Sequence, residues 1–374
     1  MKKNNFRSRV FVCLIVAVSM IPYMSANAAY RFDTFKGRPP IHQFGSASSS
    51  PAGLSPDQIK QAYNLPASGG HGTIAIVGAY DDTYAEKDLG VFDGQFNLPS
   101  CTSSNGCFEK HVIGNAKYDS NWAMEISLDV QWAHAIAPKA KILLVEATTP
   151  SGKNFMDAID YARKRAGVVA ISMSWGGAEF SDEASLDSHF KDANSAITFF
   201  ASSGDNGAGV SWPAVSPYVV AVGGTKLNFS KNGSFKSETA WSGSGGGVSA
   251  YETQPDYQAS YNITKANGFR AIPDVSYDAD PSSGFSIYHS TGSSKNGWYV
   301  VGGTSAGAPQ WAAIKSLGLS ASNAKFYADK ASAKDGKFFR DIQTGSNGDC
   351  GYYCQARSHY DYITGLGSPL TVSF

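Results

Sequence analysis

The stretch Thr73-Ile74-Ala75-Ile76-Val77-Gly78-Ala79-Tyr80 is an almost unbroken apolar run of strand length. Such a run predicts a strand that is buried on both faces, as in a parallel sheet covered by helices. Similar runs recur farther along the chain, and helical patterns alternate with them; the strands are expected at 141–147, 168–173 and 197–201, and the helices at 83–94, 120–136, 153–165 and 184–195. This alternation predicts an α/β fold of three layers, with a central, mostly parallel sheet flanked by helices.

The composition is that of a folded globular protein. The chain has 374 residues, of which 42% are hydrophobic and 17% charged, and its 31 basic groups equal its 31 acidic groups. This excludes a disordered protein and a coiled coil. It also lacks the basic excess that nucleic-acid binding requires, so no nucleic-acid partner is expected.

The N-terminus has the pattern of a secretory signal peptide. Every charged group in residues 1–28 is basic, and they precede an apolar run at 10–22 and the small-residue pattern Ala26-Asn27-Ala28, where a signal peptidase would cut. A membrane anchor is the alternative, but the run is shorter than the ~20 residues that a span needs. We therefore expect a secreted protein, extracellular or periplasmic, that keeps no membrane segment and carries four more acidic than basic groups.

The rest of the chain divides into two parts. Residues 29–54 contain two adjacent prolines and a run of small polar residues, so we expect a flexible leader or short propeptide. At Ser55-Pro56-Asp57 a helix N-cap is followed by a proline at the first helical position, which marks the start of a folded domain. This domain is predicted to span residues 55–374 and to be monomeric.

Four cysteines remain after removal of the signal peptide. An even number in an oxidising compartment favours disulfides, and we expect the local pairs Cys101–Cys107 and Cys350–Cys354. A zinc site with four cysteine ligands is the alternative. The chain has no Cys-x-x-Cys spacing, which disfavours it.

Ser305 is the candidate nucleophile. It lies in Gly302-Gly303-Thr304-Ser305-Ala306-Gly307, between a strand that is expected to end near Val301 and a helical stretch at 310–317. The start of a helix stabilises negative charge, and small neighbours let a substrate backbone approach the hydroxyl. Taken alone, the segment would be a helix cap.

A nucleophilic serine needs a base, and the usual one is a histidine. His71, in His71-Gly72-Thr73, comes before the first core strand and is expected in a turn, and the other six histidines have no signature around them and are expected at the surface. Glu125 and Asp129 offer an alternative base. They are four residues apart, share one face of an otherwise apolar helix and would repel each other unless they share a proton, which raises the pKa of the pair. As an isolated pattern, the same pair would be solvated on an outer face.

A third acid, Asp205, follows the apolar strand at 197–201 directly, in Ser203-Gly204-Asp205. Functional groups of parallel sheets gather at the carboxyl ends of strands. Taken alone, Asp205 would be a turn residue.

Together these motifs, in this order, resemble the sedolisin family, the serine-carboxyl peptidases with a subtilisin-like fold. Further matches are Ser172-Met173-Ser174-Trp175-Gly176, Trp241 with Gly246-Gly247-Val248-Ser249, Pro273-Asp274-Val275-Ser276 and Thr364-Gly365-Leu366-Gly367-Ser368-Pro369. The resemblance covers residues 55–374.

The resemblance implies a role for each catalytic position. Ser305 would be the nucleophile, Glu125 its general base, Asp129 the residue that orients Glu125, and Asp205 the group that holds the oxyanion. A carboxyl group donates a hydrogen bond only when it is protonated, so the working pH would be acidic. Ser174, Trp175 and Gly176 would form the strand edge on which a peptide substrate lies.

The resemblance also implies one structural calcium ion near the C-terminus. The acidic side chains would be Asp341 and Asp361, and the main-chain carbonyls those of Ile342, Arg357 and His359. Arg357 and His359 stand where the family has glycines.

Two other functions are compatible with parts of the sequence. Only about 25 residues separate the signal peptide from Ser55, whereas the family carries a large prodomain, so a catalytically inactive peptide-binding protein of the same fold is one alternative. The other is a Ser-His-Asp hydrolase that uses Asp81 or Asp82. The interpretation that we favour is a secreted acid endopeptidase acting on proteins or peptides.

Overall fold

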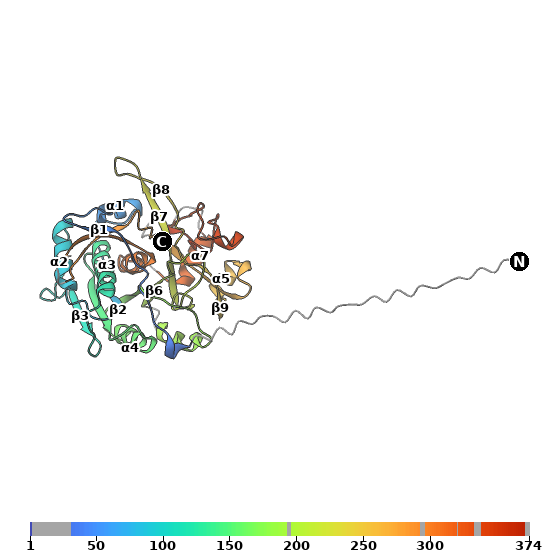
Figure 1. Cartoon of the computed structure of the whole chain (residues 1–374), viewed down its shortest axis with the longest axis horizontal. Helices are drawn as coiled ribbons and strands as arrows, with labels where there is room; N and C mark the ends of the chain where they lie inside the picture. Colours follow the sequence, from blue (N-terminus) through green and yellow to red (C-terminus); the bar gives the residue numbers. More distant parts are fainter. Residues whose placement is uncertain (2–30, 193–195, 292–295, 320, 333–337, 371–374) are drawn as a thin grey trace.

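A computed structural model describes the chain apart from residues 2–30, 193–195, 292–295, 320, 333–337 and 371–374 (Figure 1). The predicted signal peptide therefore lies almost wholly outside the described residues. Within the described residues, no helix has both the length and the apolar character that crossing a membrane requires.

The centre of the molecule is a sheet in the order β11-β7-β6-β5-β2-β4-β3, with β8 beside β7. Neighbouring strands along this order are parallel, and only the β7–β8 pair is antiparallel. The strands are β2 (Thr73–Ala79), β3 (Phe108–Val112), β4 (Lys141–Ala147), β5 (Val168–Met173), β6 (Thr198–Ser202), β7 (Val219–Phe229), β8 (Phe235–Ala240) and β11 (Val275–Asp278).

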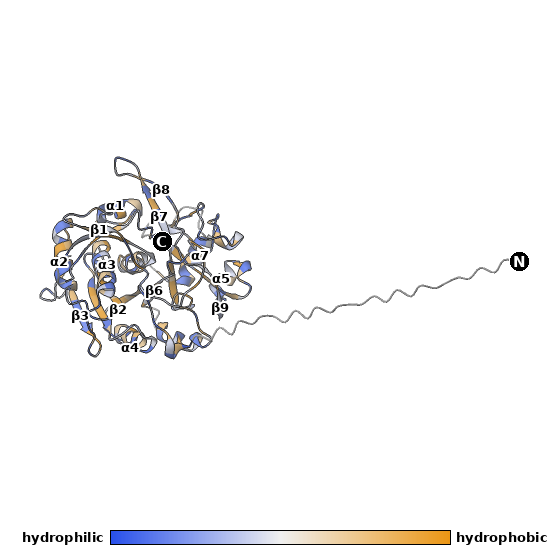
Figure 2. Ribbon diagram, viewed as in Figure 1, coloured by the Kyte–Doolittle hydropathy of each residue, from blue (hydrophilic) through white to orange (hydrophobic). Residues whose placement is uncertain are grey.

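Helices cover both faces of this sheet, which confirms the predicted three-layer α/β fold. Successive residues of β2 point to opposite faces: Ile74 and Ile76 join one hydrophobic core, whereas Ala75 and Val77 join the other. The helices α3 (Ser120–Ile136) and α6 (Gly307–Ser316) pack on the first face and α4 (Gly152–Arg163) on the second. Figure 2 shows hydrophobic residues along the strands and both hydrophobic and hydrophilic residues on these helices.

Smaller elements surround the sheet. A second sheet contains β1 (His42–Ser48), β13 (Gly297–Gly302) and β12 (Phe285–His289), and β9 (Gly247–Thr253) pairs with β10 (Phe269–Ile272). The remaining elements are α1 (Pro56–Ala62), α2 (Ala85–Phe96), α5 (Asp256–Ser260), α7 (Asn323–Ser332), β14 (Phe339–Arg340), β15 (Ser368–Pro369) and short 3₁₀ turns, including η1 (Phe32–Thr34), η4 (Thr304–Ala306) and η5 (Gly351–Cys354).

Three expectations about the elements are corrected. The described part of 29–54 is not a flexible leader: Phe35 is 1% exposed, and β1 pairs with β13. The segment at 184–195 is a 3₁₀ helix, η2 (Glu183–Phe190), in place of an α-helix. Strand β3 was not expected, because its Glu109, Lys110 and His111 hide the apolar pattern of a strand; such charged residues are typical of sheet edges.

Candidate active site

Helix α3 places Glu125 and Asp129 inside the protein. The helix begins after Asp119, whose carboxylate accepts hydrogen bonds from the backbone N–H groups of Asn121 and Trp122. Both acids are 1% exposed, so they are not the solvated pair of an outer face. Two carboxyl groups on one buried face of a helix cannot both be charged without a large free-energy penalty.

Burial is the main cause of a raised pKa at both acids. The pKa of Glu125 is raised well above its usual value by burial and then by the charge of Asp129, and the pKa of Asp129 is raised well above its usual value by burial. Ser174 Oγ donates to Asp129 Oδ1 at 2.8 Å, which opposes the rise at Asp129. The two acids are therefore suited to share a proton and to pass it on.

Ser305 faces Glu125 from η4, the turn that joins β13 to α6. Its hydroxyl lies close enough to lower the pKa of Glu125, although the pair does not meet strict hydrogen-bond geometry. Ser305 Oγ and both carboxyl oxygens of Glu125 are buried and have no hydrogen-bond partner among the described residues. In enzymes without bound substrate, the hydrogen bond between nucleophile and base is often long or poorly aligned, and it shortens when substrate binds.

Asp205 lies on the other side of the nucleophile turn. It follows β6, and its Oδ1 accepts hydrogen bonds from the N–H of Thr304 at 2.8 Å and from its hydroxyl at 2.7 Å. Burial raises the pKa of Asp205, while His42 opposes this rise, since His42 Nε2 lies 3.1 Å from Asp205 Oδ2. These contacts hold the carboxyl group beside Ser305, as its expected role requires.

Gly303 brings the backbone close to this carboxyl group. Its φ of +123° is in the region that favours glycine, and a Cβ there would lie 2.5 Å from Asp205 Oδ2 and 2.1 Å from the carbonyl oxygen of Pro40. Any other residue would displace one of these groups.

The edge formed by Ser174, Trp175 and Gly176 directly follows β5. The Trp175 side chain is fully buried, stacks on Phe155 at 3.7 Å and donates to the carbonyl of Val77, so its ring is part of the core. The backbone of Trp175, and not its ring, is therefore the part that is left to form the predicted strand edge, a role that stays a prediction. Gly176 uses both its N–H and its carbonyl in hydrogen bonds with the backbone of Arg38.

The predicted calcium residues lie together but do not fit the ion. The N–H groups of Arg357 and His359, each at 3.1 Å, point to Asp361 and Asp341 respectively, so at both positions a donor faces the acid. Asp361 also accepts from the N–H groups of Ile363 and Thr364 and from the Thr364 hydroxyl, all of which oppose the rise of its pKa to about 6 caused by burial.

The buried Lys330 side chain lies beside the other acid, Asp341. Lys330 Nζ lies 3.8 Å from Asp341 Oδ1, and Ile342 is 2% exposed. Calcium needs free oxygen ligands. Asp341 Oδ1 is buried without a hydrogen-bond partner among the described residues, but N–H donors face both acids and Lys330 lies beside Asp341, so the donor arrangement does not favour the ion. Calcium binding therefore stays an untested expectation from the resemblance and has no role in the mechanism.

Two histidines differ from the expectation of surface or turn residues, because His134 and His289 are fully buried. His42 is half exposed, as expected, and its Nε2 lies 3.1 Å from Asp205 Oδ2. No sequence signal marked His42, because it lies in the segment that was expected to be flexible.

Asp81 and Asp82 do not form a Ser-His-Asp triad with a histidine among the described residues. The Asp81 carboxylate contacts Lys110 and the Thr83 hydroxyl, and the Asp82 carboxylate accepts from the N–H of Tyr84.

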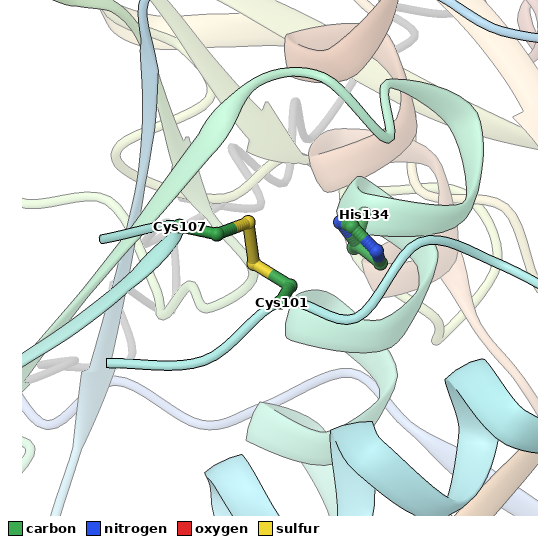
Figure 3. Close-up of side chains that lie close together, drawn as sticks. All are labelled: Cys101, Cys107 and His134. Carbon is green, nitrogen blue, oxygen red and sulfur yellow. A yellow bond between two sulfur atoms is a disulfide. The ribbon is translucent and has the colours of Figure 1, made fainter. Parts of the chain in front are cut away.

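Both predicted disulfides are confirmed: Cys101 is bonded to Cys107 and Cys350 to Cys354. Figure 3 shows His134 beside the first of them, a cluster with the residue types of a metal site. The sulfur atoms are joined to each other, and His134 Nε2 lies 2.8 Å from the carbonyl of Pro99. This cluster is therefore structural.

Comparisons with known proteins agree with this geometry. The model of the subtilase family matches residues 55–334. The chain is 32% identical over 374 residues to kumamolisin of Bacillus sp. (strain MN-32), a match covering 87% of this chain and 64% of that protein. It is 27% identical over 370 residues to sedolisin of Pseudomonas sp. (strain 101), covering 86% and 60%. It thus spans less than two thirds of these relatives' length.

A solved structure shows the same architecture. Pseudomonas sedolisin, a serine-carboxyl proteinase complexed with two molecules of pseudo-iodotyrostatin, superposes with a TM-score of 0.72 at 28% identity, over 87% of this chain and 96% of that one. The chain therefore belongs to the subtilase family. Within that family, its relatives and its motifs place it among the sedolisins, and its fold is subtilisin-like.

Proposed function

We propose that this protein is a secreted serine-carboxyl peptidase, an endopeptidase that hydrolyses peptide bonds of proteins or peptides at acidic pH. The observation that carries the proposal is the buried group of Glu125, Asp129 and Ser305, in which the hydroxyl and the Glu125 carboxyl face each other without other partners. The basic, then apolar, N-terminus supports secretion.

In the acylation step, Glu125 removes the proton from Ser305 Oγ as that oxygen attacks the substrate carbonyl carbon. Asp129 positions Glu125 and shares its proton. Asp205 in its protonated form donates a hydrogen bond to the oxygen that becomes negative in the transition state. The proton on Glu125 then passes to the leaving amine, and water releases the acyl group by the same steps in reverse.

The acids also explain why the pH should be low. Burial raises the pKa of Asp205, so this group stays protonated to a higher pH than an ordinary aspartate, and it loses the donor proton as the pH rises through that pKa. The base has to be one carboxylate of a pair that holds a proton between them. The donor proton of Asp205 and the shared proton of the pair are both lost as the pH rises, which favours activity on the acid side.

The test is hydrolysis of a denatured protein by the purified chain at about pH 4. We expect Ser305→Ala to abolish turnover and Glu125→Gln to lower kcat/KM about 10²–10⁴-fold, because the amide cannot act as a base. Matched controls are Ser237→Ala, on the exposed face of β8, and Glu109→Gln, whose carboxylate is half exposed. Activity that survives Ser305→Ala would refute the proposal. Peptide binding without turnover by the unaltered chain would favour the inactive alternative.

A further inference from the structure

An apolar pocket lies beside the candidate active site. Its volume is about 520 Å³, within the range of roughly 300–1,000 Å³ that is usual for ligand pockets. Small and apolar residues make up most of its lining, among them Val210, Val248, Ala266, Phe269 and Tyr353. Phe269, the first residue of β10, is 40% exposed. Exposed apolar surface that is gathered in a pocket indicates a binding site, unlike a single exposed side chain.

The pocket adjoins the catalytic cleft. Val210 lines the pocket and also the cavity of about 500 Å³ that contains Asp205. The neighbouring Gly209 pairs with Gly246 through two main-chain hydrogen bonds of 2.9 and 2.7 Å, and both glycines line the pocket. A peptide that lies beside Asp205 can therefore continue over Val210 into the pocket.

The second disulfide supports the aromatic wall of the pocket. Cys350 lines the pocket and is bonded to Cys354, so the bond closes a loop that contains Tyr352 and Tyr353. The Tyr353 hydroxyl donates to the carbonyl of Lys265 at 3.1 Å. This wall is thus in place before a ligand binds, which lowers the entropy lost on binding.

Two cations lie against this wall. Lys265 lines the pocket, and its Nζ lies 3.4 Å from the centroid of the Tyr352 ring, while Arg357 Cζ lies 4.4 Å from the same centroid. Both residues are exposed, and neither side chain forms an ion pair with an acid among the described residues. The ring attracts each cation, but the two cations repel each other, so an anion beside them would be stabilised by both.

A second pocket, of about 380 Å³, lies on the other side of Lys265 and offers hydrogen-bond donors. Tyr360 and Tyr362 line it and are buried, and their hydroxyls have no hydrogen-bond partner among the residues that the structure describes. A buried hydroxyl without a partner costs free energy that an oxygen atom of a ligand would recover. Lys265 lines both pockets, so a cation and free donors adjoin the apolar pocket, a combination that suits a carboxylate.

We propose that the two pockets form an exosite, a substrate-binding site outside the catalytic centre, for a segment of a protein substrate in which a large apolar side chain stands next to an aspartate. The apolar side chain occupies the pocket at Phe269, and the aspartate, which keeps its charge down to about pH 4, contacts Lys265 and Arg357. This inference rests on the proposed function, since the adjoining cleft is what makes a protein substrate the occupant. It involves contacts only, and no bond is made or broken.

The inference can be tested by peptide binding, without catalysis. In the Ser305→Ala background, isothermal titration calorimetry at about pH 5.5 compares the peptides Gly-Asp-Phe-Asp-Gly, Gly-Asp-Ser-Asp-Gly and Gly-Asn-Phe-Asn-Gly. The first should bind about tenfold more tightly than the second, because burial of one Phe ring is worth at least that factor. It should bind about two- to fivefold more tightly than the third, and this smaller difference should vanish in high salt, because exposed ion pairs are weak and screened.

Phe269→Ala should remove the preference for phenylalanine over serine, because the substitution deletes the apolar wall that the ring contacts. Tyr251→Ala is the matched control: Tyr251 is an aromatic residue of β9, is 44% exposed and does not line the pocket. Equal affinity for the phenylalanine and serine peptides, or a preference that survives Phe269→Ala, would overturn the inference.

Lys265→Ala with Arg357→Ala should remove the preference for aspartate over asparagine and leave the preference for phenylalanine as it is. The matched control is Lys231→Ala with Lys236→Ala, two exposed cations that line neither pocket. A preference for aspartate that survives the first pair, or disappears with the control pair, would contradict the acidic half of the inference.

The chain with Ser305 intact separates this inference from the proposed function. Two fluorogenic peptides are compared, one of which carries the Asp-Phe-Asp segment at both ends. The extended peptide should have a KM about tenfold lower and the same kcat, and Phe269→Ala should abolish the difference. Turnover of both peptides with equal KM would refute the exosite and keep the peptidase. The expected binding preferences without turnover by any variant would support the exosite and refute the peptidase.

Discussion

Asp274 and Glu125 are both buried carboxyl groups, but they differ in the hydrogen-bond donors around them. Asp274 is fully buried and accepts hydrogen bonds from both terminal nitrogens of Arg270, from the Tyr327 hydroxyl at 2.9 Å and from the N–H of Ala221 at 2.8 Å. Glu125 is 1% exposed, and neither of its oxygens has a partner of good geometry among the described residues.

The difference separates a structural carboxylate, Asp274, from Glu125, which the proposed function makes the general base. Asp274 has a cation and enough donors to stay charged, so its lone pairs are occupied and it has none to offer to a substrate. Glu125 has an acid and a hydroxyl as neighbours, so a proton must supply the missing positive charge. A proton that is held this way can move, whereas the guanidinium of Arg270 cannot.

Removing each carboxylate should therefore have opposite consequences. Asp274→Asn leaves Arg270 buried without its counter-charge and is expected to lower the free energy of unfolding by about 3–5 kcal/mol. Glu125→Gln removes a strained buried acid and should leave stability equal or higher, while activity falls. Urea unfolding at neutral pH, followed by circular dichroism, measures both; a larger loss of stability for Glu125→Gln would contradict the comparison.

The proposed donor role of Asp205 can be tested by replacing its carboxyl group. Asp205→Ala removes the expected oxyanion donor and should lower kcat about 10²–10³-fold at acidic pH. Asp205→Asn keeps an N–H donor that does not titrate, so its kcat should be higher than that of Asp205→Ala. This advantage should persist at a pH where the aspartic acid of the unaltered chain has lost its proton. The pH profiles of kcat for the two variants provide the measurement, and identical profiles would rule out a donor role.

A smaller effect is expected from Glu183, which is fully buried and accepts from the N–H of Phe180 at 2.9 Å. Burial and the charge of Glu179 raise the pKa of Glu183 to about 9, against its usual 4.5. The folded protein therefore binds more protons than the unfolded chain between these values, and stability must fall as the pH rises through that window.

The measurement is Tm against pH for Glu183→Gln and for the unaltered chain. The substitution removes this titration, so the decline from about pH 5 to pH 8 should be smaller by about 2 °C or more. Glu109→Gln, at a half-exposed ion pair with Arg165, is the matched control and should leave the decline as it is. Parallel curves for Glu183→Gln and the unaltered chain would show that Glu183 stays ionised when folded.

The smallest expected effect is that of metal removal. Hydrogen-bond donors face Asp361, and the Lys330 side chain lies 3.8 Å from Asp341 Oδ1, so a positive charge already stands near these acids. Dialysis against a chelator should consequently shift Tm by less than about 1 °C, as differential scanning calorimetry can show. A fall of several degrees that added calcium reverses would establish the ion and reject this donor arrangement.

Much of the fold and part of the site could be predicted from the sequence. The apolar runs and the helical periods predicted strands β2, β4, β5 and β6 and helices α2, α3 and α4, because strand and helix patterns are local properties. The four-residue spacing of Glu125 and Asp129 placed both acids on one face of a helix for the same reason. The order of the motifs around these elements indicated the family.

The sequence did not predict which segments would line the cleft beside Asp205. Residues 29–54 were expected to be flexible because they contain little apolar material, yet Phe35 and Leu54 are buried in the core. The contact of His42 with Asp205 depends on two elements that are far apart in the chain. Such a contact has no local pattern, so local reasoning could not find it.

By itself, then, the sequence determined the three-layer fold, the identity of the candidate catalytic residues and the two disulfides, since each rests on short-range spacing or on residue chemistry. The tertiary structure alone decided their environment: that Glu125 and Asp129 are buried, that Ser174 reaches both Asp129 and the backbone of Ser305, and that Arg38 pairs with Gly176 while His42 lies beside Asp205. The physical reason is that burial and long-range contacts arise only when the distant elements pack together, and burial is what raises the pKa of these acids.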